Sequence, residues 1–309
     1  MTSLAERYEA VVCDLDGVVY RGPSAVRHAV EALDALSIPV VYATNNASRT
    51  PAEVAAHLGA LGVTCTAEQV VTSSDAAAWL LTDEVAPGAE VLAVGGAGVA
   101  VALEAAGFVP VRADGAAERA VPAAVVQGYG PAVSAADLAE AAYAVEAGAR
   151  WVATNTDATL PTDRGVAPGN GSLVAAVARA VGHDPAVVAG KPHPPLYLLA
   201  AARLDLDVSR VLAVGDRLDT DIEGARRAGM DSLLVLTGVD DLEAAVGAPT
   251  EQRPTFIAPD LRWLHRDPDA GEPSLTALGT AVERARDAPP DEDSRLVEAY
   301  SLLSGLSGE

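Results

Sequence analysis

The sequence contains little cysteine, a single lysine and no long apolar segment. With only Cys13 and Cys65 present, nothing suggests a disulfide framework, so a reducing cytoplasm is the expected compartment. No run of about 18 residues lacks a charged or turn-forming residue, so no membrane span is expected. The first ten residues, MTSLAERYEA, lack the apolar core of a secretory signal, so secretion is not indicated.

Positive charge is also scarce. The chain carries 43 acidic and 21 basic residues, a net charge of −22. This argues against nucleic acid or an anionic membrane as the main partner. The same charge repels an anionic substrate unless its site carries positive charge of its own. All basic residues but Lys191 are arginines. A flexible ammonium is a point charge that a planar guanidinium does not replace well, so Lys191 is singled out.

The apolar pattern predicts a doubly wound α/β fold. Half of the 309 residues are hydrophobic, enough for one large or two ordinary domains. We predict a Rossmann-like parallel-sheet core formed by residues 1–83 and 186–265, interrupted by an inserted α/β cap domain at 84–185. Residues 266–309 are predicted to be a peripheral appendage with one helix near 291–303. Strands are predicted at 10–13, 38–43, 90–95, 108–112, 124–128, 151–154, 211–215, 231–236 and 255–257, and helices at 24–35, 51–61, 97–106, 134–147, 172–181 and 194–203.

Two carboxylates follow the first predicted strand. Asp14 and Asp16 come directly after the apolar run 10–13, and Gly17 allows the chain to turn away. In an open α/β sheet, ligands bind outside the carboxyl ends of the strands. Residues two apart on an extended strand face the same way, and like charges that close repel unless a cation or reacting group joins them. A strand-ending turn is the alternative, and we favour the functional interpretation.

Other predicted strands end in residues of matching chemistry. Thr44 and Asn45 follow the second strand just before a helix, an arrangement that suits an anion. Lys191 lies in a proline-rich loop, and Asp216 and Asp221 follow the strand at 211–215. Converging carboxylates suit Mg²⁺, and an ammonium with a hydroxyl and an amide suits a phosphoryl group.

A glycine-rich turn raises a different possibility. Residues 94–98 follow a strand and open a helix, as in a dinucleotide-binding fingerprint. Position 100 is Ala, which a variant of the fingerprint allows, and Asp114 is near enough to act as the acidic residue. An ordinary tight turn between strand and helix explains the same pattern, and we prefer it.

Two loops of the predicted insertion contain further polar residues. Asn155 and Asp157 end a strand, whereas residues 168–172 precede a helix with Asn170 or Ser172 as its N-cap. Both loops have ordinary turn composition, and both could also line the mouth between the two domains.

Four of these segments together resemble the haloacid dehalogenase superfamily of phosphotransferases. DLDGVVY at 14–20 is similar to its first motif, Thr44–Asn46 to the second, Gly190–Pro192 to the third and GDRLDTD at 215–221 to the fourth. The resemblance implies that Asp14 is the nucleophile and Asp16 the general acid and then base. Because the dehalogenase branch lacks an acid at the position of Asp16, a phosphate ester is preferred to a haloacid as substrate.

The resemblance also implies the binding residues. Lys191 would neutralise Asp14 and the transferring phosphoryl group. Mg²⁺ would be held by Asp14, the backbone carbonyl of Asp16 and Asp216, with Asp221 supporting either the metal or Lys191. The implied phosphate- and substrate-binding residues are Thr44, Asn45, Asn46, Asn155, Asp157 and Asn170.

An α/β insertion between the second and third motifs is similar to that of the NagD-like branch, which includes p-nitrophenyl phosphatases. TNNASR (44–49), TLPT (159–162) and PGNGS (168–172) resemble glycerol-3-phosphate phosphatases of actinobacteria. We therefore expect a Mg²⁺-dependent phosphomonoesterase acting on a small phosphorylated metabolite, with glycerol 3-phosphate as first choice. Phosphoglycolate, pyridoxal phosphate, a sugar phosphate and a nucleotide monophosphate stay open, as does a nucleotide-binding module. Caps of this kind often pair in relatives, so a homodimer is one expectation.

Overall fold

A computed structural model describes every residue of the chain except 1, 114–119, 163, 272, 289–295 and 308–309. The chain forms two compact units. The first comprises Met1–Ala43, Ala56–Cys65 and Ala200–Glu309, and the second comprises Thr44–Ala55 and Thr66–Leu199. The insertion predicted at 84–185 therefore lies wholly in the second unit. That unit also contains 66–83 and 186–199, which the sequence assigns to the core.

A parallel sheet forms the centre of the first unit. Its strands lie in the order β15-β14-β13-β1-β4, so β1 is flanked by β13 and β4. All residues of β1 and β13 are buried, as expected for strands covered on both faces. Cys13 pairs with Val214, so the residues that follow β1 and β13 emerge at the same edge of the sheet. These strands are β1 (Ala10–Cys13), β4 (Val40–Thr44), β13 (Val211–Gly215), β14 (Asp231–Val235) and β15 (Phe256–Ala258).

A short hairpin follows β1 and corrects the helix predicted at 24–35. Strands β2 (Tyr20–Arg21) and β3 (Ser24–Ala25) pair antiparallel, so residues 24 and 25 are extended. Helix α1 is limited to Ala29–Asp34. The apolar spacing of this stretch fits a helix, but the cross-strand pairing of the hairpin overrides it.

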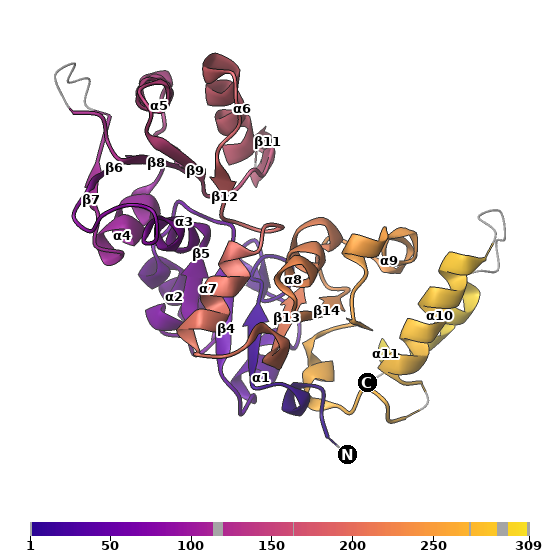
Figure 1. Ribbon diagram of the computed structural model, residues 1–309. Helices are drawn as coiled ribbons and strands as arrows, with labels where there is room; N and C mark the ends of the chain where they lie inside the picture. Colours follow the sequence, from indigo (N-terminus) through magenta and orange to yellow (C-terminus); the bar gives the residue numbers. More distant parts are fainter. Residues whose placement is uncertain (1, 114–119, 163, 272, 289–295, 308–309) are drawn as a thin grey trace. The chain divides into compact units, whose positions relative to one another are not determined.

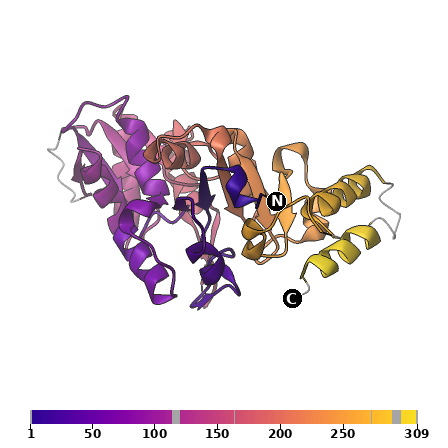
Figure 2. The same ribbon diagram turned by 90° about the horizontal axis from the view of Figure 1, so that it is seen from below.

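Two helices end the chain, where the sequence predicts one near 291–303. Helix α10 (Leu275–Asp287) packs against α9 and β15, and α11 (Val297–Ser307) packs against α10 (Figure 2). Residues 291–295 of the predicted helix lie outside the described residues. None of the helices in the described chain is long and apolar enough to cross a membrane. The other helices with residues in this unit are α2 (Pro51–Ala60), α7 (Pro195–Arg203), α8 (Glu223–Ala228) and α9 (Leu242–Gly247), with short helical turns at Ala5–Arg7, Val208–Arg210, Leu218–Ile222, Thr250–Gln252 and Leu261–His265.

The second unit contains its own parallel sheet, in the order β12-β9-β8-β6-β7. Helices α5 and α6 pack together on one face, and α3 and α4 lie on the other (Figure 1). Trp151, Leu92 and Val125 belong to the core under α5 and α6. The elements are β5 (Val70–Thr72), β6 (Glu90–Val94), β7 (Val109–Val111), β8 (Ala124–Gln127), β9 (Arg150–Ala153), β12 (Val187–Val188), α3 (Ser73–Leu81), α4 (Ala97–Ala105), α5 (Ala135–Glu146) and α6 (Asn170–Val181), with a 3₁₀ turn at Ala67–Gln69.

Two features of this unit differ from the sequence-based expectation. Strand β12 pairs with β9, so the chain is still part of this sheet at Val187, where the core was expected to resume. An antiparallel hairpin of β10 (Thr159–Thr162) and β11 (Gly165–Pro168) was not predicted. Its two prolines weaken the strand signal, since proline is confined to edge strands. The fold class itself, parallel α/β with a second α/β sheet, is confirmed.

Candidate active site

Three carboxylates converge at the edge of the first unit's sheet. Ligand oxygens of Asp14, Asp216 and Asp221 all lie within 4.8 Å of one another. Asp14 extends β1, since its N–H donates to Val214 O at 2.9 Å, and Asp216 directly follows β13. Asp216 and Asp221 are buried, so their charges need compensation. Hard oxygen donors of this kind fit Mg²⁺, and the structure brings together three of the four residues predicted to hold it.

Glycines make room for these carboxylates. A Cβ atom at Gly17 or Gly238 would overlap the side chain of Asp216, and one at Gly215 would overlap Asp221. Gly17 also adopts φ of +85°, a backbone conformation that other residues rarely take. The acidic cluster is therefore packed by backbone on several sides.

The loop after β14 holds Asp216 in place. Val239 N donates to Asp216 Oδ2 at 2.7 Å, and Asp240 N donates to the Asp216 carbonyl at 3.1 Å. The hydroxyl of Thr237 donates to the Gly17 carbonyl at 2.8 Å. None of the site residues predicted from the sequence lies in this loop. The available signal was Gly238, which lies between Thr237 and Val239 and three residues after the end of β14.

Asp16 lies outside the three-carboxylate cluster. Asp14 is partly buried, Leu15 is buried and Asp16 is exposed. The hydroxyl of Tyr20 donates to Asp16 Oδ2 at 3.3 Å. An exposed carboxylate held on the turn beside the nucleophile candidate is suited to proton transfer rather than to holding a cation through its side chain.

In the second unit, four of the predicted residues form one hydrogen-bond network. Asn45 Oδ1 accepts from Lys191 N at 2.8 Å, and Asn45 Nδ2 donates to Lys191 O at 3.0 Å. The same Nδ2 lies 3.3 Å from both carboxylate oxygens of Asp157, and Asn155 Nδ2 donates to Asn45 O at 2.7 Å. Lys191 is buried. Segments far apart in the sequence therefore meet at the backbone of the only lysine.

Asn46 and Thr44 form the turn between β4 and α2. Asn46 Oδ1 accepts from Ser48 N at 2.9 Å and from Arg49 N at 3.3 Å, so its side chain caps its own turn. Thr44 Oγ1 accepts from Asn46 N at 3.1 Å. A hydroxyl that accepts one hydrogen bond still has its proton to donate.

Asn170 has a structural position at the start of α6. The N-cap of this helix is Gly169, not Asn170 or Ser172 as the sequence suggests. Asn170 is almost fully buried, and its Nδ2 donates to Asn155 O at 2.7 Å and to Gln127 O at 3.2 Å. It thus fixes the ends of β8 and β9, which support the Asn155 loop.

The dinucleotide-binding alternative fails at its glycines. A Cβ atom at Gly96 would lie 2.6 Å from Ser48 O, and one at Gly98 would overlap the backbone of Ala47 and Arg49. Gly98 N donates to Ser48 O at 3.2 Å. The start of α4 is therefore covered by the chain's own backbone, where a pyrophosphate would have to lie. Asp114 lies outside the described residues.

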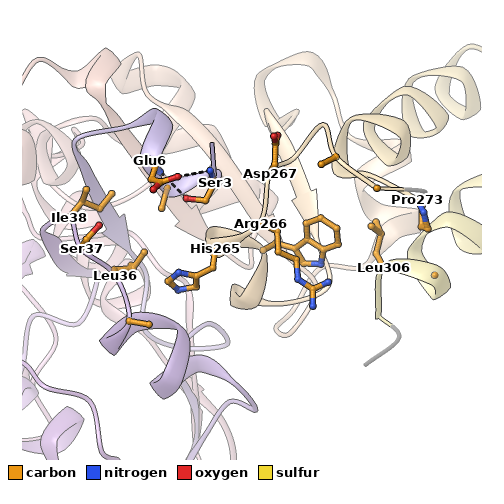
Figure 3. Close-up of a pocket in the computed structure, with 16 residues that line it drawn as sticks. Ser3, Glu6, Leu36, Ser37, Ile38, His265, Arg266, Asp267, Pro273 and Leu306 are labelled. Atoms are coloured by element: carbon orange, nitrogen blue, oxygen red, sulfur yellow. Dashed lines mark hydrogen bonds between the residues drawn. The ribbon is translucent and has the colours of Figure 1, made fainter. Parts of the chain in front are cut away.

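A cavity of about 810 Å³ lies elsewhere in the first unit (Figure 3). Its walls include Glu6, Ile38, His265 and Leu306. Glu6 and Ile38 precede β1 and β4, so the cavity lies at the amino ends of these strands, whereas Asp14 follows the carboxyl end of β1. The cavity is thus not part of the acidic site.

Comparisons with known proteins agree with this geometry. Residues 11–109 match the family described as haloacid dehalogenase-like hydrolase, and residues 188–264 match a second, HAD-hydrolase-like family. The chain is 51% identical over 267 residues to the D-glycerol 3-phosphate phosphatase of Mycobacterium tuberculosis, covering 86% of this chain and 74% of the relative. The crystal structure of the glycerol phosphate phosphatase of M. tuberculosis with magnesium superposes with a TM-score of 0.81, covering 86% of this chain and 79% of that one.

Two further relatives are more distant. The acid sugar phosphatase of Staphylococcus saprophyticus is 37% identical, covering 85% of this chain and 98% of the relative. The 4-nitrophenylphosphatase of Thermotoga maritima is 28% identical with a TM-score of 0.76, covering 84% of this chain and 97% of that one. The clustered Asp14, Asp216 and Asp221 and these matches lead to one conclusion: the chain belongs to the haloacid dehalogenase-like hydrolase family and to its NagD- and p-nitrophenylphosphatase-like branch.

Proposed function

We propose that this chain is a Mg²⁺-dependent phosphomonoesterase that hydrolyses glycerol 3-phosphate. The observation that carries the reaction class is the cluster of Asp14, Asp216 and Asp221, which combines a nucleophile candidate with hard ligands for a divalent cation. Bound Mg²⁺ would neutralise charge on the phosphoryl oxygens as the reaction proceeds. Of this cluster, Asp216 and Asp221 are assigned to metal binding alone.

Asp14 and Asp16 divide the covalent chemistry between them. A carboxylate oxygen of Asp14 attacks phosphorus, the ester P–O bond breaks, and an aspartyl-phosphate forms. Asp16 gives its proton to the leaving alkoxide. It then takes a proton from water, which attacks the aspartyl-phosphate and releases inorganic phosphate and free Asp14. The exposure of Asp16 supports this role, because both the leaving group and water must reach it.

Thr44 and Lys191 are assigned to the phosphoryl group. The Thr44 hydroxyl, which accepts from Asn46 N, has its own proton to donate to a phosphoryl oxygen. Lys191 supplies the positive charge that an anionic substrate needs in a protein of net charge −22. Asn155, Asp157 and Asn170 are proposed to act on the substrate through the shape of the loop that they build.

Glycerol 3-phosphate is the proposed substrate because the relative with 51% identity is named for it. A sugar phosphate is the second candidate, favoured by the 37% identity to acid sugar phosphatases. We also propose a cytoplasmic location, on the scarcity of cysteine. A homodimer is one expectation, because caps of this kind often pair in relatives, and light scattering on the purified chain tests it.

An ester screen with one inactivating variant tests the proposal. The wild-type chain with Mg²⁺ should release phosphate from glycerol 3-phosphate faster than from sugar phosphates, phosphoglycolate, pyridoxal phosphate or a nucleotide monophosphate. Asp14→Asn should lower kcat by more than about 10³-fold, as expected for loss of a nucleophile, while the circular dichroism spectrum is unchanged. Full activity of Asp14→Asn would overturn the nucleophile assignment. Preference for another ester would overturn the substrate but leave the reaction class.

A further inference from the structure

The side-chain amide of Asn45 pairs with the main chain of Lys191. Asn45 Oδ1 accepts from Lys191 N at 2.8 Å, and Nδ2 donates to Lys191 O at 3.0 Å. Two bonds between one amide and one residue's backbone fix both position and orientation. The orientation of the amide follows from the donor, since only an oxygen can accept from a backbone N–H.

This pairing leaves the Asn45 side chain without an N–H group that could donate a hydrogen bond to a phosphate. A carboxamide has two N–H protons. One points to Lys191 O, and the other faces the Asp157 carboxylate, whose oxygens lie 3.3 Å from Nδ2. The remaining atom, Oδ1, is an acceptor, as phosphate oxygens are. Direct phosphate binding would require Asn45 to release Lys191 or Asp157.

The residues around Asn45 favour its pairing with the backbone of Lys191. A Cβ atom at Gly190 would lie 2.5 Å from Asn45 Oδ1 and 2.7 Å from Thr154 O, so only glycine allows the close approach. The backbone of Asn45 is held separately: its carbonyl accepts from Ser73 Oγ and from Asn155 Nδ2, each at 2.7 Å. Both ends of Asn45 are thus fixed before any ligand arrives.

We propose that Asn45 and Asp157 form a clamp that positions Lys191. In this clamp Asn45 binds the backbone of Lys191, and Asp157 orients the side-chain amide of Asn45. Asp157 lies in the loop between β9 and β10, so this loop and the lysine are coupled through one side chain. The proposal rests on the proposed function, because Lys191 acts there as the phosphoryl-binding cation. Asn45 and Asp157 are accordingly positioning residues, and the substrate does not touch the Asn45 side chain.

The single lysine gives a direct, activity-independent readout of the clamp. Protein labelled with ¹⁵N-lysine shows one backbone amide signal, because Lys191 is the only lysine of the sequence. This amide N–H is the one that donates a hydrogen bond to Asn45 Oδ1. Hydrogen exchange of this amide should be slow in the wild type and at least about tenfold faster in Asn45→Ala, because the acceptor is lost. Asp157→Ala should give a smaller acceleration. Ser134→Ala removes the α5 cap and serves as a control for general destabilisation, leaving this amide protected.

Kinetics on the full-length chain tests the catalytic consequence. Asn45→Ala should lower kcat/KM for glycerol 3-phosphate by about 100-fold, the effect expected from a misplaced catalytic group. Asp157→Ala should lower it less, Asp157→Asn should restore most of the loss, and the double variant should match Asn45→Ala within about threefold, since coupled residues are not additive. If Asn45→Ala fails to fold, Asp157→Ala keeps the clamp falsifiable, because unchanged exchange of the Lys191 amide in that variant would contradict the proposed role of Asp157.

Two results would overturn the clamp. One is unchanged exchange of the Lys191 amide in Asn45→Ala. The other is full additivity of Asn45→Ala and Asp157→Ala, which would indicate independent contacts with the substrate. A wild-type chain that hydrolyses no phosphate ester would instead overturn the proposed function, and the exchange experiment separates these cases because it needs no turnover.

Discussion

At the scale of single residues, the acidic site depends on the absence of a side chain at Gly238 as well as on the three carboxylates. Gly238 follows Thr237, which is bonded to the turn after Asp14, and precedes Val239, which is bonded to Asp216. A methyl group at position 238 would overlap the Asp216 side chain, so this carboxylate must move away from its partners.

Gly238→Ala is therefore expected to weaken Mg²⁺ binding. Forced overpacking costs typically about 1–3 kcal/mol, which corresponds to a rise of about 5- to 140-fold in the Kd for Mg²⁺. Isothermal titration with MgCl₂ measures this directly. Gly59→Ala is the matched control, since a Cβ atom there meets nothing within 4 Å and the Kd should be unchanged. Equal affinities of the two variants would contradict the packing argument.

The convergence of Asp14 with Asp216 and Asp221 could be predicted from the sequence, because parallel strands present their carboxyl ends at one edge. The hydrogen-bond partners of Asn45, Asn46 and Asn170 could not be predicted. An amide in a turn serves the backbone or a ligand equally well, and the choice depends on partners more than 100 residues away, as between Asn45 and Lys191. The family resemblance implies that all three amides bind phosphate or substrate, with a helix cap as the alternative for Asn170, and in the structure each has a backbone partner.

At the scale of elements, strong apolar runs were predictable and weakly patterned segments were not. Strands β1 and β13 follow from buried Val-rich runs with clear ends. Helix α10 was missed because its mean hydropathy is low and the surrounding sequence is rich in Asp and Pro. Leu275, Leu278 and Val282 nevertheless lie at helical spacing and are buried, so the 3.6-residue period was the signal available.

The turn Leu261–His265 offers a test of electrostatics at this scale. Its N-cap, Asp260, accepts from Arg262 N at 2.9 Å and from the Arg262 guanidinium at 2.8 Å. Burial alone would raise the pKa of Asp260, but the hydrogen bonds and charge of Arg262 outweigh it and hold this pKa below its ordinary value. A lowered folded-state pKa stabilises the protein above the unfolded-state pKa of about 3.9, and this contribution is lost as the pH falls through the folded value.

Asp260→Asn should therefore destabilise the chain in a pH-dependent manner. The free energy of unfolding should fall by about 1 kcal/mol at pH 7, since asparagine caps the turn but lacks the charge facing Arg262. The difference from wild type should shrink as the pH falls below the unfolded-state pKa of about 3.9 and through the lower folded-state pKa, because Asp260 then loses its charge as well. Urea unfolding at pH 7, 5 and 3 measures it. Asp260→Ala, which also loses the cap, should keep a deficit at every pH, and a constant deficit for Asp260→Asn would refute the pKa argument.

At the scale of the whole molecule, the negative net charge has opposite effects on the metal ion and on the substrate. A chain of net charge −22 attracts Mg²⁺ and repels a phosphate monoester. In the proposed function, Lys191 and the bound cation supply the local positive charge for the ester. Lys191 is buried, so salt screens its short-range contacts less than it screens the surface field.

Salt should consequently act on metal and substrate with opposite signs. Between 10 and 150 mM NaCl the Debye length falls from about 30 to about 8 Å, which removes most of the long-range field. The KM for glycerol 3-phosphate at saturating Mg²⁺ should then fall roughly two- to threefold, and the Kd for Mg²⁺ should rise by a similar factor. Steady-state kinetics and metal titration across the salt series measure the two slopes. A KM that rises with salt would mean that positive charge local to the site, rather than the net charge of the chain, governs the approach of the substrate.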